Sequence, residues 1–165
     1  MHVNRRTATL IVVVIAVIAG VYAITWWQRA RETQRLLGDL HVADHGVATK
    51  AMEGLRDRAP AIRAELMRML REGGDRQRWR AAMLLGDARG PEVREALIEA
   101  LGDRAPDVRL AAAVSLGRLG ARNAADRIAM LAADADEEIA VRAAAVRTLE
   151  RLRAAAHFAE VRAIA

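Results

Sequence analysis

The feature that most constrains the fold of this chain is an uncharged, apolar segment from Thr7 to Gln28. At about 1.5 Å of rise per residue, a helix of this length spans roughly 33 Å, which matches a hydrocarbon core of about 30 Å. Tyr22, Trp26 and Trp27 lie where the aromatic belt of a membrane helix is expected. We therefore predict an N-terminal tail over residues 1–8 and a single transmembrane helix over residues 9–27.

A cleaved signal peptide is the alternative for this segment. Arg5 and Arg6 form a suitable basic start, and the stretch from Val21 to Ala23 ends in a small residue that tolerates cleavage. Two tryptophans follow soon after that point, and the apolar run is longer than that of most signal peptides. Both features favour an anchor that is retained.

The arginines on the two sides of the segment bear on its orientation. Arg5 and Arg6 stand before it, and Arg29, Arg31 and Arg35 stand after it, so the positive-inside count is nearly balanced. A very short tail with two arginines is normally held in the cytoplasm. We therefore predict that the rest of the chain lies outside the cytoplasm.

The net charge of +5 and the sequence pI of about 11.0 suggest a nucleic-acid partner only weakly. Without Arg5 and Arg6, 24 of the 26 basic residues remain against 21 acidic ones. Basic and acidic residues alternate along the chain, which is typical of a solvated surface rather than a basic stripe. The absence of cysteine excludes disulfides, thiolate metal sites and a cysteine nucleophile.

Beyond the apolar segment, the sequence repeats about every 31 residues. Two ladders of apolar residues carry this period: Leu55, Leu85, Leu116 and Leu149 form the first, and Leu66, Leu97, Ile128 and Val161 form the second. Each repeat is predicted to be a helical hairpin. The first helices are predicted over Val47 to Leu55, Gln77 to Leu85, Pro106 to Leu119 and Glu137 to Leu152; the second helices are predicted over Pro60 to Arg71, Pro91 to Leu101, Ala124 to Ala133 and Ala154 to Ile164.

Residues that start and stop helices support these boundaries. Proline is tolerated in the first turn of a helix, and glycine ends a helix because it adopts the left-handed conformation at little cost. Aspartate before a helix is a common cap. The prolines are Pro60 and Pro91; the glycines are Gly86, Gly120 and the pair Gly73 and Gly74; the aspartates are Asp75, Asp103 and Asp134.

A single hairpin buries too little apolar area to be stable, so the repeats are expected to stack into one continuous core. Alanine runs at residues 111–113 and 143–145 permit close helix packing. We predict an all-α fold: an α-solenoid of about four helical hairpins over residues 44–165. A juxtamembrane helical linker over residues 28–43 connects it to the transmembrane helix.

The segment from Asp107 to Gly120 resembles the first helix of a HEAT repeat of the short bacterial, phycobilisome-lyase-like type, and the segment from Pro91 to Leu101 resembles its second helix. The resemblance is strongest over residues 75–153. It departs from the pattern where Glu150 replaces a glycine and Ala48 an arginine. It implies an armadillo/HEAT-type superhelix that binds other proteins, and it implies no reaction. The membrane would then be the bacterial inner (cytoplasmic) membrane, with the repeats on its periplasmic side.

The strongest candidate for a metal site is the segment from His41 to His45, where two histidines stand one helical turn apart with Asp44 between them. It resembles the inverted zinc-peptidase pattern His-x-x-Glu-His, with a shorter acid. The simpler interpretation is that Asp44 caps the next helix and that both histidines are exposed linker residues. We favour this second interpretation and predict no metal and no cofactor.

Other enzymatic interpretations have less support. No histidine is followed by glutamate, as the resemblance to HEAT-like di-iron hydroxylases would require. Trp79, the one tryptophan after the linker, is expected in the core rather than in a base-excision groove. Met67, Met69 and Met83 are expected to fill the core. Activity on bilin chromophores, which the lyase relatives imply, is not favoured because repeats serve as scaffold there too.

The favoured function is therefore that of a non-enzymatic, membrane-anchored adaptor or assembly subunit. Its partner is expected to be a protein, in particular a membrane protein or membrane complex, rather than a nucleic acid. Solenoids of this kind present a concave face lined by their second helices. The candidate binding residues on that face are Arg63, Arg68, Arg94, Glu95, Glu99 and Arg127. The alternative is an accessory enzyme, either lyase-like or dependent on a metal at His41 and His45.

Overall fold

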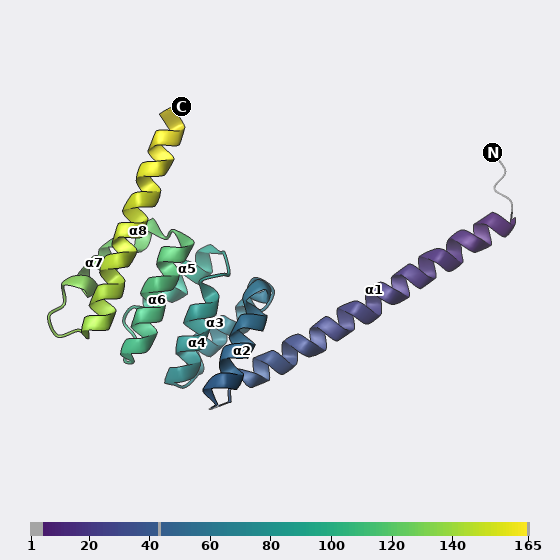
Figure 1. Ribbon diagram of the computed structural model, residues 1–165, viewed down its shortest axis with the longest axis horizontal. Helices are drawn as coiled ribbons and strands as arrows, with labels where there is room; N and C mark the ends of the chain where they lie inside the picture. The colour runs from purple at the N-terminus through teal and green to yellow at the C-terminus, as the bar shows by residue number, and fades with distance from the viewer. Residues whose placement is uncertain (1–4, 43, 165) are drawn as a thin grey trace.

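The computed structural model describes residues 5–42 and 44–164, with side chains placed for residues 13–42, 44 and 46–155. All regular structure in these residues is helical (Figure 1). The eight α-helices are α1 (Arg5–Asp39), α2 (His45–Leu55), α3 (Arg63–Glu72), α4 (Asp75–Leu85), α5 (Pro91–Ala100), α6 (Pro106–Leu119), α7 (Ala125–Ala133) and α8 (Ile139–Ile164). Two short 3-10 helices, η1 (Arg56–Arg58) and η2 (Arg122–Ala124), lie in the turns.

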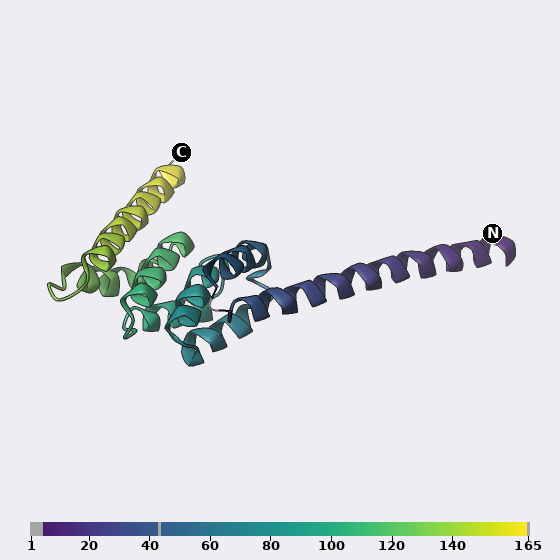
Figure 2. The ribbon, with the colours of Figure 1, turned by 60° about the horizontal axis from the view of Figure 1, so that its bottom comes forward.

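From α2 onward the helices pack as consecutive pairs that stack side by side. In the row of first helices, α4 packs against α6, and α6 packs against α8; the second helices α3, α5 and α7 cover this row. The first part of α1 runs away from the stack, and both views show this separation (Figures 1 and 2). The predicted all-α architecture of paired helices is therefore confirmed.

The two apolar ladders form the centre of the core. Leu55, Leu85 and Leu116 are fully buried and Leu149 is half-buried. In the second ladder, Leu66, Leu97 and Ile128 are also fully buried, while Val161 lies outside the residues whose side chains are described. A leucine that returns every 31 residues is thus placed at the same depth in each unit, which is the packing expected for stacked hairpins.

Glycine and serine or threonine control how closely the first helices approach. Ser115 donates a hydrogen bond to the carbonyl of Ala82 (2.8 Å), and Thr148 donates one to the carbonyl of Ala113 (3.2 Å). A Cβ atom at Gly86 would lie 2.8 Å from Oγ of Ser115, and a Cβ atom at Gly117 would lie 2.9 Å from Cγ2 of Thr148. Each glycine therefore makes room for the hydroxyl side chain of the next repeat.

The predicted glycine stops are right in position, but only Gly120 works through the left-handed conformation. Gly120 ends α6 with φ +64°, and it is the one residue in the left-handed region in the described part of the chain. Gly86 keeps right-handed helical angles at the end of α4, because its role is the close approach to Ser115. Gly73 is extended at the end of α3.

The predicted aspartate caps are wrong in detail. Asp75 is the first residue of α4, and Gly74 precedes it as the cap, with its N–H bonded to Oε1 of Gln77 (3.0 Å). Asp103 and Asp134 instead organise turns, since each accepts a hydrogen bond from the N–H two residues ahead (2.8 and 3.0 Å). The carboxylates of Asp103 and Asp134 therefore stabilise the loops between repeats rather than the first turns of the helices.

Two predicted second helices also differ from the structure. The one predicted from Pro60 begins at Arg63, because the chain first leaves α2 through η1 and a turn at residues 59–62. The one predicted from Ala154 to Ile164 is not a separate helix, because α8 runs without interruption from Ile139 to Ile164. Arg153 stands where Gly120 ends α6, and an alanine run follows it, so nothing stops the helix. The stack therefore has three hairpins and a single last helix.

The C-terminal end of α1 belongs to the core of the stack. Leu37 is 8% exposed and Leu40 is fully buried, both in the same apolar cluster as the ladders. Arg58 binds this part of α1 from outside, with a hydrogen bond to Oγ1 of Thr33 (3.0 Å) and an ion pair to Glu32 (2.6 Å). The predicted linker over residues 28–43 is thus helical through Asp39, but its last residues are part of the repeat core.

A buried arginine completes this connection. Arg80 on α4 is 3% exposed, and its Nη1 donates to the carbonyls of Leu40 (2.5 Å) and Val42 (3.0 Å). Burial and the nearby Arg76 both lower the pKa of Arg80. Because these carbonyls follow directly on α1, Arg80 joins α1 to the second unit of the stack.

Candidate functional site

The histidine segment has the geometry of a helix cap. Oδ1 of Asp44 accepts a hydrogen bond from the N–H of Val47 (2.9 Å), which is the bond of an N-cap residue. Nδ1 of His41 lies 3.0 Å from the carbonyl oxygen of Leu37, one turn earlier on α1. The side chain of His45 lies outside the described residues. Among the residues with described side chains, no three His, Asp or Glu side chains gather as metal ligands.

The six candidate binding residues lie on three helices of the second row. Arg63 and Arg68 lie on α3, Arg94, Glu95 and Glu99 lie on α5, and Arg127 lies on α7. Arg94 and Arg63 are partly buried and the others are exposed. The stack therefore presents these charges from successive repeats.

Half of these six residues are occupied by contacts within the protein. Arg63 spans two repeats: its Nε lies 3.1 Å from Glu92 and its Nη1 donates to the carbonyl of Arg89 (3.0 Å). Arg68 forms an ion pair with Glu65 one turn earlier, and Glu95 accepts a hydrogen bond from Asn123 (3.3 Å). Arg94, Glu99 and Arg127 have no such contact among the described side chains, so these three are available to a ligand.

Two partly buried ion pairs join consecutive repeats. Arg78 donates hydrogen bonds from Nε and Nη2 to the two carboxylate oxygens of Asp103, both at 2.7 Å. Arg109 donates from the same two nitrogens to the carboxylate of Glu137, at 2.5 and 2.6 Å. The hydrogen bond to Asp103 raises the pKa of Arg78, and the one to Glu137 raises the pKa of Arg109. Such bidentate pairs fix the stacking geometry.

The two carboxyl groups respond in the opposite direction. Burial works to raise the pKa of Asp103, but the hydrogen bonds from Arg78 and from the N–H of Ala105 outweigh it, so this pKa is lowered. The hydrogen bond from Arg109 lowers the pKa of Glu137. Both groups are held as carboxylates by their arginines, which suits a structural role and not a proton-transfer role.

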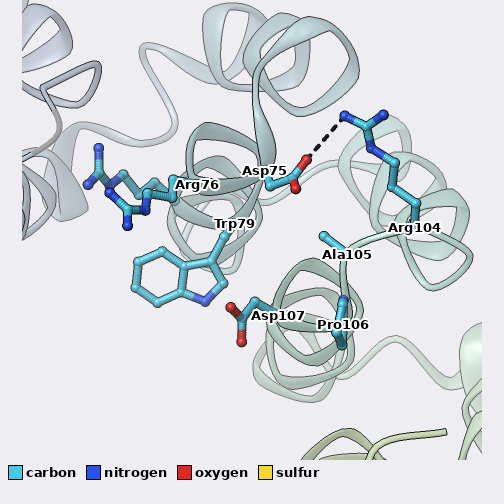
Figure 3. A pocket seen from close by; sticks show the side chains of 8 residues that line it. Asp75, Arg76, Trp79, Arg104, Ala105, Pro106 and Asp107 are labelled. Atoms are coloured by element: carbon cyan, nitrogen blue, oxygen red, sulfur yellow. Dashed lines mark hydrogen bonds and ion pairs between the residues drawn. The ribbon is translucent and has the colours of Figure 1, made fainter.

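A hollow with a volume of about 940 Å³ lies between the N-terminal ends of α4 and α6. Figure 3 shows the indole of Trp79 directed into it, with the carboxylate of Asp107 nearby. On the rim, Asp75 and Arg104 form an ion pair of 3.2 Å. We call this hollow, lined also by Arg76, Arg80, Ala105 and Pro106, the Trp79 groove.

Trp79 was expected in the core, and this holds only for part of its side chain. It is partly buried against the apolar cluster, while the rest of the ring lines the groove. The groove combines an aromatic wall with both signs of charge, as protein-binding surfaces often do. The sequence contains a signal for it, since Trp79 and Asp107 stand near the starts of two successive first helices, but only the stacking brings them together.

The apolar segment lies on the outside of the molecule. Within the residues with described side chains, Val13–Asp39 is the one helical stretch long and apolar enough to cross a membrane, and Val13 through Arg29 are all exposed. The guanidinium of Arg31 stacks 3.9 Å from the ring of Trp27, at the polar end of the segment. By length and composition such a helix serves either as an anchor or as a signal sequence.

A comparison with protein families identifies the repeats. The family model described as HEAT repeats matches residues 64–150, which is more than half of the chain. This region runs from the start of α3 well into α8 and includes both ion pairs between repeats. No curated protein matches the chain.

Proposed function

Since the chain belongs to the HEAT-repeat family, we propose that it is a non-enzymatic, membrane-anchored adaptor or assembly subunit that binds a protein partner. HEAT repeats imply a scaffold for protein–protein interaction. The buried charged side chains of this stack bind one another or backbone carbonyls, as in Arg78 with Asp103 and Arg80 with Leu40. These contacts hold neighbouring helices together, which is a structural role and suits a scaffold.

The observation that carries the proposal is the path of α1. One helix of 35 residues contains the apolar segment and ends at Asp39, between the core residues Leu37 and Leu40. A membrane anchor of this kind would hold the stack through a continuous helix rather than through a flexible tether. The repeats would then be presented at a fixed angle, which suits a subunit that positions a partner near the membrane.

We assign partner binding to the second-helix face, and in particular to Arg94, Glu99 and Arg127. These side chains have no ion pair within the described residues, so binding a partner breaks no internal contact there. Arg63, Arg68 and Glu95 supply the polar surround. Mixed charge on such a face favours a polar protein surface over the uniform negative charge of a nucleic acid.

We further propose that α1 is retained as an anchor in the bacterial inner membrane, with the repeats on the periplasmic side. Arg5 and Arg6 support this orientation against Arg29, Arg31 and Arg35. The partner would be a membrane protein or a membrane complex with a domain on the same side.

The test is purification of the full-length protein, tagged at its C-terminus, from its native membrane in a mild detergent. We expect a protein to co-purify in a fixed ratio. The variant Arg94→Ala, Glu99→Ala, Arg127→Ala should lose it, whereas Glu53→Ala, Arg147→Ala, Arg153→Ala, which alters exposed charges on the first helices α2 and α8, should keep it. Purification of the wild type alone from gently solubilised membranes would contradict the proposal.

The rival function is a metal-dependent accessory enzyme acting through His41 and His45. Metal analysis of the purified protein separates the two functions. We expect no stoichiometric zinc or iron; bound metal that is lost in the His41→Ala, His45→Ala variant would favour the rival.

A further inference from the structure

A charged residue recurs one or two positions after each leucine of the first ladder. Asp87, Arg118 and Arg151 each follow the leucine of the first ladder by two residues, and Arg56 follows Leu55 by one. Because the repeats stack in order, these four residues come from neighbouring units. In chain order, Arg56 is positive, Asp87 is negative, and Arg118 and Arg151 are positive.

The first three residues of this series, Arg56, Asp87 and Arg118, form ion pairs with one another. Oδ1 of Asp87 is in contact with Nη2 of Arg118, and its Oδ2 lies 3.6 Å from Nε of Arg56. Arg118 also donates through Nη1 to the carbonyl of Met83 (3.2 Å). A carboxylate thus lies between two guanidinium groups from the units on either side.

The series has no carboxylate between its last two members, Arg118 and Arg151. Arg118 and Arg151 line one hollow of about 670 Å³, together with Arg89 and Arg94. Asp87, Gly86 and Leu119 complete the lining, so four guanidinium groups face one carboxylate. Among the described side chains, Arg89, Arg94 and Arg151 have no ion pair. We call this hollow the arginine groove.

We propose that the arginine groove binds a carboxylate-rich segment of the protein partner, with one carboxylate seated between Arg118 and Arg151. That carboxylate would continue the alternation that Asp87 begins. Arginine binds carboxylates through two parallel hydrogen bonds, and this protein already uses that geometry between repeats at Asp103 and Glu137. This inference rests on the proposed function and names the chemistry of the partner.

The charge around the groove favours a short acidic segment over a nucleic acid. Glu92 and Glu95 stand on either side of Arg94 along α5, and Glu150 precedes Arg151 on α8. A nucleic acid would extend past the groove and meet these acids, whereas it requires a continuous basic path.

The position of the groove also disfavours lipid headgroups. Its lining comes from the loop after α4 and from α5, α6 and α8. The apolar part of α1 leaves the stack at the other end, beyond α2 (Figure 1). Headgroups around that part of α1 are therefore remote from the groove.

The test measures binding of a fluorescein-labelled hexaglutamate peptide to the full-length protein in a non-ionic detergent. The variant Arg89→Gln, Arg94→Gln, Arg151→Gln removes three groove charges. The control Arg71→Gln, Arg147→Gln, Arg153→Gln removes three exposed charges elsewhere, and Arg153 is two residues from Arg151 on the same helix. We expect the groove variant to weaken binding by about tenfold or more, and the control by less than about twofold. Equal weakening in both variants would overturn the proposal, since net charge alone would then explain binding.

Three further measurements complete the test. The groove variant should unfold at the same temperature as the wild type or higher, because it relieves repulsion between like charges; a lower temperature would point to a structural role instead. Tighter binding of oligothymidylate or of phosphatidylglycerol vesicles than of hexaglutamate, lost in the groove variant, would assign the groove to those ligands. A partner that co-purifies equally with the wild type and the groove variant would refute the groove and leave the adaptor function standing. Groove-dependent hexaglutamate binding without any co-purified partner would support the groove chemistry and refute the adaptor function.

Discussion

Replacing Arg80 by methionine should loosen the connection between α1 and the repeats. Arg80 is buried, and its Nη1 donates to the carbonyl oxygens of Leu40 and Val42, at the end of α1. Methionine retains most of the side-chain volume but donates no hydrogen bond. The two carbonyls would then lose their arginine donor, and the carbonyl of Leu40 would lose it in a buried position.

The size of the effect follows from two opposing contributions. A hydrogen bond from a charged donor contributes about 1.5–3 kcal/mol, so two of them give roughly 3–6 kcal/mol. Removing the buried charge offsets part of this loss of stability, because burial disfavours the charged form of Arg80, as its lowered pKa indicates. We expect a net loss of about 2–3 kcal/mol. In a protein of this size, this corresponds to a fall of roughly 4–12 °C in the midpoint of thermal unfolding.

The assay is thermal unfolding followed by circular dichroism, with hydrogen exchange of the amides of residues 36–42 measured in parallel. In Arg80→Met the midpoint of thermal unfolding should fall, and the amides at the end of α1 should exchange faster. Arg76→Met is the matched control, since Arg76 is exposed one turn away on α4 and repels Arg80. It should be neutral or slightly stabilising. An Arg80→Met variant with wild-type stability and unchanged exchange would refute the claim that Arg80 joins α1 to the stack.

Three further predictions concern the packing, the ion pairs and the orientation. Gly117→Ala should destabilise the protein by about 1–2 kcal/mol in urea unfolding, because the new Cβ would lie 2.9 Å from Cγ2 of Thr148. In a Thr148→Ser background, which lacks Cγ2, the same change should be neutral or stabilising. An equal loss of stability in that background would contradict the steric reason. Asp103 and Glu137 have lowered pKa values in the folded state, so the stability they supply is complete above about pH 4.5 and is lost as the pH falls through their folded pKa values. In the double variant Asp103→Asn, Glu137→Gln, the midpoint of thermal unfolding should therefore fall less steeply as the pH is lowered than in the wild type. The same dependence of the midpoint on pH in both proteins would count against these pairs. Alkaline phosphatase fused after residue 165 should be active and should lose activity in Arg5→Ala, Arg6→Ala, whereas an inactive fusion beside a fluorescent cytoplasmic reporter would place the repeats inside.

The sequence predicts the repeat because apolar burial has a strict period. Leu85, Leu116, Leu97 and Ile128 are buried where the ladders place them, and the first helix from Pro106 to Leu119 has its predicted bounds. The sequence does not predict the end of the array equally well. Glu150 departs from the glycine of the pattern, and among the described residues α8 packs only against α6 and α7, so no first helix approaches it closely at this position.

The candidate sites were less predictable, because they depend on contacts between repeats. Arg94, Glu99 and Arg127 look alike in sequence to Arg63, Arg68 and Glu95, and only the structure separates the unpaired from the paired residues. Arg80 looks like any charged residue of an amphipathic helix, although it is buried and bonded to Leu40, forty residues earlier. The arginine groove joins Arg89 to Arg151 across 62 residues, so its charge is invisible to a local search for basic clusters.

The measurement that tests the central claim most directly is photo-crosslinking of the full-length protein in its native membrane. A photoreactive amino acid is placed at position 94, 99 or 127 of the second-helix face, and at position 147 or 153 of α8 as controls. We predict that the three face positions crosslink to one and the same protein and that the two control positions do not. The absence of crosslinks from all three face positions, or equal crosslinks from face and control positions, would contradict the account of this protein as a membrane-anchored scaffold with a defined binding face.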